Sequence, residues 1–129
     1  MSAAPIGPSI LVVDDELLIR WALSQALTDA GYRVREADSG KGALSELDHE
    51  PHPSVVLLDY CLPDVQDLGL LSSIVSRGPS VRVILMTAFG TRDLPDEALA
   101  RGAYAVLHKP FDLSAIVTLV ARASAEPIH

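Results

Sequence analysis

The chain has 129 residues, of which 49% are hydrophobic and 21% charged, so it is long enough for one domain with a substantial core and too short for two. Its net charge of −7 argues against nucleic acid or an anionic membrane as the direct ligand. A single cysteine, Cys61, excludes an internal disulfide and fits a reducing compartment. No apolar run approaches a membrane span, and residues 1–8 lack the features of a signal peptide, so we expect a cytoplasmic protein with a short flexible leader.

Strand-like and helix-like segments alternate along the rest of the chain. Short runs of β-branched and aliphatic residues predict strands at residues 9–13, 32–37, 54–59, 81–86 and 104–107. Helical periodicity and end signals predict helices at residues 17–30, 40–47, 68–77 (with Asp67 as the cap), 91–101 and 113–120. Connections of this kind are typical of crossovers between parallel strands, so we expect an α/β fold in which helices cover both faces of a five-stranded parallel sheet.

The segment 54–59 organises the rest of the chain. Its continuous apolar run is typical of a strand that is buried on both faces, and the run ends at Asp59, with Pro63 shortly after. This pattern places a carboxylate at the exposed end of the strand. An aspartate at such a place also commonly starts a turn, so the segment alone leaves both interpretations open.

Polar residues follow the predicted strands at the edge where their carboxyl ends meet, which is where parallel sheets build their sites. These residues are Asp14, Asp15, Asp59, Thr87 and Lys109. Three neighbouring carboxylates repel one another unless a cation joins them, and oxygen ligands without histidine or thiol favour Mg²⁺. A hydroxyl and an ammonium group are what a phosphoryl group on a carboxylate needs.

We therefore interpret Asp59 as a nucleophile that is phosphorylated, Asp14 and Asp15 as metal ligands, Thr87 as a hydrogen-bond donor and Lys109 as the ionic partner of Asp59 or its phosphate. Each residue also has an ordinary explanation: adjacent acids often begin a helix, a strand can end in a hydroxyl, and a lysine can be solvated. Lys109 is one of only two lysines in the chain. Coincidence at four strand ends explains the pattern poorly.

Four segments together resemble the receiver domain of two-component response regulators; they are residues 10–16 (ILVVDDE), 59–63 (DYCLP), 86–90 (MTAFG) and 109–112 (KPFD). The resemblance implies a flavodoxin-like (CheY-like) sheet of order 2-1-3-4-5 within a domain of residues 9–123, followed by a tail or linker at 124–129. It also implies a sensor histidine kinase as phosphodonor, Mg²⁺ as cofactor, the backbone carbonyl of Cys61 as a further metal ligand and a cis Lys109–Pro110 peptide.

A finer resemblance concerns residues 18–23 (LIRWAL) and 87–90 (TAFG), which are similar to receivers of the nitrogen-regulator class of enhancer-binding activators. Those proteins carry an ATPase and a DNA-binding domain that this chain lacks. The resemblance implies that phosphorylation rearranges the surface of residues 91–123, to control an output domain or partner or to form a homodimer. Pro95 weakens the helix of that surface, which suits a switch, and is equally an ordinary first-turn proline.

Departures from the receiver pattern affect how switching and dephosphorylation proceed. Val106 occupies the position where receivers of this kind usually place an aromatic residue, and we expect Tyr104 to face the other side of the strand as a packing residue. Phe89 offers no polar group to orient an attacking water, so we expect slow loss of the phosphate.

Two alternative functions stay open: a phosphorelay intermediate or phosphate sink, and a pseudo-receiver that binds a partner without phosphorylation. A conventional enzyme is not expected, because no general base is evident beyond the metal-site acids.

Overall fold

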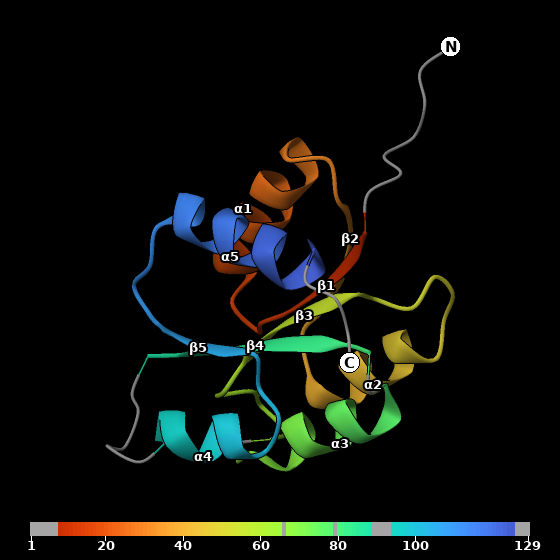
Figure 1. Cartoon of the computed structure of the whole chain (residues 1–129), viewed down its shortest axis with the longest axis vertical. Helices are drawn as coiled ribbons and strands as arrows, with labels where there is room; N and C mark the ends of the chain where they lie inside the picture. Colours follow the sequence, from red (N-terminus) through yellow and green to blue (C-terminus); the bar gives the residue numbers. More distant parts are fainter. Residues whose placement is uncertain (1–7, 66, 79, 89–93, 126–129) are drawn as a thin grey trace.

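The computed structural model describes residues 8–65, 67–78, 80–88 and 94–125 (Figure 1). The strands are β1 (Ser9–Val13), β2 (Arg33–Ala37), β3 (Val55–Asp59), β4 (Arg82–Thr87) and β5 (Ala105–His108). The helices are α1 (Leu17–Asp29), α2 (Gly40–Leu47), α3 (Gly69–Arg77), α4 (Leu94–Ala100) and α5 (Leu113–Ala125). All strand pairs are parallel, in the order β2-β1-β3-β4-β5, which confirms the predicted flavodoxin-like fold.

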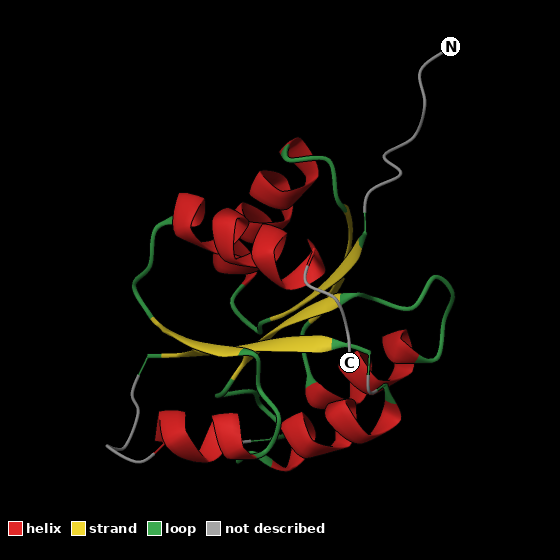
Figure 2. Cartoon of the chain, in the orientation of Figure 1, coloured by secondary structure: helices red, strands yellow, loops and turns green. Residues whose placement is uncertain are grey.

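The sheet lies between two layers of helices, with α1 and α5 on one face and α2, α3 and α4 on the other (Figure 2). Every residue of β1 and of β3 is buried, as their continuous apolar sequences predict for central strands covered on both sides. Successive side chains alternate between two cores. Leu11 and Val56 pack in the core beneath α2, α3 and α4, whereas Ile10 and Leu57 pack in the core beneath α1 and α5.

The ends of the helices largely follow the sequence signals. Gly31 follows α1 in a left-handed conformation, with φ of 100°, which confirms it as the stop of that helix. The expected cap of α3 is displaced by one residue: Leu68 is the N-cap, and the Asp67 carboxylate instead accepts the backbone N–H of Gly69 at 2.8 Å. The predicted start of the fourth helix at residues 91–93 lies outside the described residues, and α4 is described from Leu94.

Tyr104, just before β5, and Val106, within it, lie on opposite faces of the sheet. Val106 packs against the core beneath α2, α3 and α4. Tyr104 packs on the other face of the sheet, in the core beneath α1 and α5, and the guanidinium of Arg82 lies 5.4 Å from its ring centroid. This confirms Tyr104 as a packing residue on the opposite side from Val106.

Helix α5 continues to Ala125, beyond residue 123, where the sequence predicts the domain to end. The domain limits themselves, with the leader at 1–8 and the tail at 124–129, stay a prediction. Among the described residues, none of the helices is long and apolar enough to cross a membrane.

Candidate functional site

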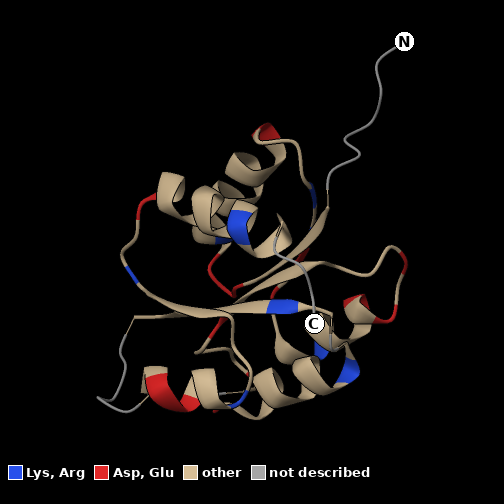
Figure 3. Ribbon diagram, in the orientation of Figure 1, with Lys and Arg blue, Asp and Glu red and all other residues tan. Residues whose placement is uncertain are grey.

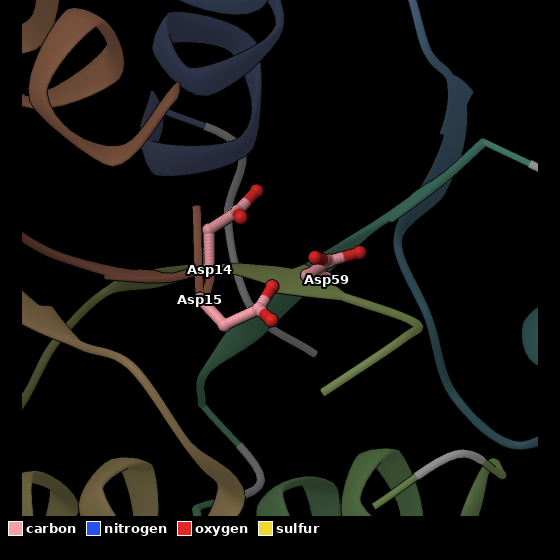
Figure 4. A group of neighbouring side chains, drawn as sticks. All are labelled: Asp14, Asp15 and Asp59. Atoms are coloured by element: carbon pink, nitrogen blue, oxygen red, sulfur yellow. The ribbon is translucent and has the colours of Figure 1, made fainter. Parts of the chain in front are cut away.

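Three carboxylates meet where β1 and β3, neighbours in the sheet, both end. Asp14 and Asp15 follow β1 directly, and Asp59 is the last residue of β3. One oxygen from each lies within 4.8 Å of the others, and Figure 4 shows the Asp15 carboxylate directed toward Asp59. Asp14 is fully buried and Asp59 is 6% exposed, whereas Asp15 is exposed. Other acidic residues lie on loops and helices across the molecule (Figure 3), but these three form a cluster with two buried members.

Lys109 supplies the positive charge at this cluster. Its Nζ atom lies 2.9 Å from Asp14 Oδ2, 3.4 Å from Asp59 Oδ2 and 3.7 Å from Glu16 Oε1. The sequence predicts Asp59 as the ionic partner of Lys109. In the structure Lys109 contacts Asp59 and, more closely, Asp14. Burial by itself lowers the pKa of Lys109, but the hydrogen bond to Asp14 and the charge of Asp59 outweigh burial and raise it, so the ammonium stays charged.

The pKa of the Asp59 carboxyl group is raised. Burial, followed by the negative charge of Asp14, raises its pKa from the ordinary value of 3.8 to about 6. Lys109 and the backbone N–H of Cys61, which donates to Asp59 Oδ1 at 3.3 Å, oppose this change without cancelling it. An excess of negative charge therefore remains at the cluster, which is the condition in which a divalent cation binds favourably.

The chemistry of the donor groups fits a hard cation. Three carboxylates offer oxygen ligands, with no imidazole among them, and Mg²⁺ binds through a few carboxylates while it keeps several waters. A pocket of about 460 Å³ opens onto the cluster and is lined by Asp15, Glu16, Asp59, Tyr60, Cys61, Thr87, Ala88 and Lys109. This pocket is open to solvent on one side and has room for both a cation and a phosphoryl group.

Thr87 and Cys61 border the same pocket. Thr87 ends β4 and is 1% exposed, and its carbonyl accepts the backbone N–H of Lys109 at 2.8 Å, which ties the ends of β4 and β5 together. The structure thus brings together the residues that the sequence placed at the strand ends, with Cys61 beside them. The individual roles of these residues, including the Cys61 carbonyl as a ligand, stay predictions, and Phe89 lies outside the described residues. The Lys109–Pro110 peptide is cis, as the resemblance implied.

Two side chains outside the predicted set of site residues, Arg20 and Asp64, bind the backbone around the site. Arg20 of α1 is 16% exposed, and it donates to the backbone carbonyl of Asp14 at 2.8 Å and to Glu36 at 2.9 Å. Asp64, in the loop after β3, accepts backbone N–H groups from the start of α2. Arg20 connects Asp14 to Glu36 of β2, and Asp64 connects the loop after β3 to α2 across 23 to 24 residues; no local pattern signals these contacts.

A doubly wound sheet with acids at the ends of β1 and β3, a threonine at the end of β4 and a lysine after β5 defines the receiver class of signalling domains. The family profile of the response regulator receiver domain matches residues 10–121. The chain belongs to this family.

Relatives narrow the class further. The chain is 41% identical over 112 residues to the DNA-binding transcriptional regulator NtrC of Klebsiella pneumoniae, covering 87% of this chain and 24% of the relative. It is 39% identical over 114 residues to the regulatory protein AtoC of Escherichia coli, covering 88% of this chain and 24% of that protein. The chain therefore spans about a quarter of the length of these curated relatives.

A solved structure gives the same result. The receiver domain of NtrX from Brucella abortus superposes with a TM-score of 0.83 at 32% identity, and the match covers 92% of this chain and 99% of that one. The predicted resemblance to nitrogen-regulator receivers is confirmed.

Proposed function

We propose that this chain is a phosphorylation-dependent switch in the cytoplasm, in which Asp59 accepts a phosphoryl group from a sensor histidine kinase. The observation that carries the proposal is a cluster of three carboxylates in a receiver fold, two of which line one pocket together with a buried threonine and a charged lysine. Asp14, Asp15, Asp59 and the Cys61 carbonyl would hold Mg²⁺. The bound ion would supply charge neutralisation for the phosphoryl oxygens.

The chain's own residues then perform a simple displacement. An oxygen of ionised Asp59 attacks phosphorus, the bond from phosphorus to the imidazole nitrogen of the donor histidine breaks, and its electron pair stays on that nitrogen. Lys109 neutralises one of the transferred oxygens, and the Thr87 hydroxyl donates a hydrogen bond to another. The same groups would let the domain catalyse its own phosphorylation from a small phosphodonor.

The kinase has to reach this edge of the sheet, and α1 offers it an apolar contact. Leu18 and Trp21 of α1 are 78% and 60% exposed. Other residues of the same helix, including Ile19 and Ala22, line a groove of about 590 Å³ that extends to Lys109 and Phe111. Large exposed apolar side chains clustered next to a functional site mark a protein contact. We therefore assign this face to the phosphodonor and the surface of α4, β5 and α5 to the output.

The output is a transcriptional domain or a partner protein that the receiver controls, with a homodimer as one route. The relatives support this proposal, because NtrC is named as a DNA-binding transcriptional regulator and this chain matches only about a quarter of it. Val106 in place of an aromatic residue means that the movement of Thr87 would be transmitted through aliphatic packing in the core beneath α4.

Intact mass spectrometry after incubation with acetyl phosphate and Mg²⁺ tests the central claim. One added phosphoryl group is expected, and it should disappear with EDTA and in an Asp59→Asn variant. If rapidly quenched samples carry no adduct, the chain is a pseudo-receiver and the proposal fails. Onward transfer of the phosphoryl group to a histidine phosphotransfer domain, without any change of the output surface, would favour a phosphorelay intermediate.

A further inference from the structure

Asp64 joins two parts of the chain that lie 23 to 24 residues apart. Its two carboxylate oxygens accept the first backbone N–H groups of α2: Oδ1 accepts that of Gly40 at 2.8 Å, and Oδ2 accepts that of Lys41 at 3.0 Å. Ser39 caps the same helix end through a bond from Gly42 at 3.0 Å. The two hydrogen bonds lower the pKa of Asp64, although its side chain is exposed.

The contact between the loop after β3 and α2 is also close in a steric sense. A Cβ atom on Gly40 would lie 2.6 Å from Val65 Cγ2 and 3.3 Å from Asp64 Oδ1. Gly40 is buried and leaves no space between the helix and the loop. Residues 64–65 are therefore held against α2 by two hydrogen bonds and by packing.

The segment held in this way carries the expected metal ligand. Tyr60 N–H donates to the Met86 carbonyl at 2.8 Å at the start of the loop, and Leu62, which is 2% exposed, donates to the Val65 carbonyl at 3.1 Å. Cys61 lies between these two bonds. Its backbone is thus fixed from the sheet on one side and, through Leu62 and the Asp64 contact, from α2 on the other.

We propose that Asp64 is a positioning residue that presets the Cys61 carbonyl for the divalent cation by holding the loop against α2. This inference deepens the proposed function and rests on it. A carbonyl that is already in place loses less conformational freedom when the ion binds. The smaller entropy cost increases the affinity for the ion. At saturating ion concentration the loop is ordered by the ion itself, and Asp64 then contributes little to the rate of phosphorylation.

Isothermal titration calorimetry with Mg²⁺ tests this directly on the whole chain. Asp64→Ala should raise the Kd for Mg²⁺ about tenfold, the lower end of what removing a group that orients a metal ligand costs. Asp64→Asn keeps one acceptor oxygen and should fall between Asp64→Ala and the original protein. With acetyl phosphate, the Mg²⁺ concentration for half-maximal phosphorylation should rise in parallel, while the maximal rate stays within about twofold.

The control separates positioning from charge. Asp38 is an exposed acid that follows β2 at the same edge of the sheet, so Asp38→Asn also removes one negative charge near the site. Its Kd should change less than twofold. Equal Kd values for Asp64→Ala and Asp38→Asn would overturn the inference, as would a maximal rate that excess Mg²⁺ fails to restore.

Two further outcomes are distinguishable from these. If Asp64→Ala does not fold, the Asn variant decides the question, and an unchanged Kd in that variant refutes the positioning role. If the original protein itself neither binds Mg²⁺ nor becomes phosphorylated, the proposed function fails, and the inference fails with it.

Discussion

Replacement of Asp59 by asparagine should make the metal-free protein more stable at neutral pH. Asp59 is buried beside Asp14, and its pKa in the folded chain is raised from 3.8 to about 6. A carboxyl group with a raised pKa contributes full stability below the lower value, and that contribution is lost as the pH rises from 3.8 through about 6. The difference between the two pKa values corresponds to a loss of about 3 kcal/mol when it is complete. Asparagine has the same shape and no charge, so it avoids this loss.

The assay is urea unfolding in EDTA, followed by circular dichroism at pH 4 and at pH 7.5. Acids away from the cluster contribute equally to both proteins, so the difference in the free energy of unfolding between Asp59→Asn and the original protein isolates the cluster of Asp59 and Asp14. That difference should grow in favour of the variant by about 2 kcal/mol between the two pH values, since part of the loss is already present at pH 4. A difference that is independent of pH, or a variant that is less stable at pH 7.5, would refute the electrostatic reasoning.

Two other substitutions test the neighbours of the site. Lys109→Gln leaves the buried pair Asp14 and Asp59 without a cation, so the metal-free protein should lose about 3 kcal/mol or more in urea unfolding, and Mg²⁺ should restore part of it; a loss below about 0.5 kcal/mol would contradict the ion-pair geometry. Leu18→Ala should reduce phosphoryl transfer from a phosphorylated histidine kinase several-fold while the rate with acetyl phosphate stays unchanged, because Leu18 is 78% exposed on the helix that we assign to the donor. Equal effects on both donors would remove the assignment of α1 to the kinase.

The sequence places the residues at the strand ends together because of a property of parallel sheets. The carboxyl ends of all the strands meet at one edge, so residues such as Asp14, Asp59 and Thr87 could be placed together from strand ends alone. The central strands were also recognisable, because a strand covered on both faces shows an uninterrupted apolar run such as residues 55–58. The proposed chemistry of the site therefore follows from where each run ends.

The sequence does not predict the contacts between loops. Lys109 lies closer to Asp14 than to Asp59, by 2.9 Å against 3.4 Å, and this order depends on the path of a loop rather than on strand register. Arg20 binds the backbone of Asp14 and the side chain of Glu36, and Asp64 binds backbone groups of α2; an arginine in a helix or an aspartate in a loop gives no sign of its target. The same limit explains the cap of α3, where a shift of one residue moves Asp67 from the helix end to the preceding turn.

The close approach at Gly40 yields a prediction that distinguishes packing from helix propensity. Alanine normally favours a helix over glycine by about 1 kcal/mol, so propensity alone predicts that Gly40→Ala stabilises the protein. The added methyl group would instead lie 2.6 Å from Val65 Cγ2, and we expect a net loss of about 1–3 kcal/mol from overpacking in thermal or urea unfolding.

Val65→Ala removes the opposing methyl groups, so the double variant Gly40→Ala/Val65→Ala should be more stable than the sum of the single changes predicts, by about 1 kcal/mol or more. Additive effects would mean that the loop after β3 moves away from α2 at little cost in free energy when the methyl group is added. In that case the loop is not fixed tightly enough for Asp64 to preset a metal ligand, and the tenfold change in Mg²⁺ affinity expected for Asp64→Ala should shrink to the size of the Asp38→Asn control.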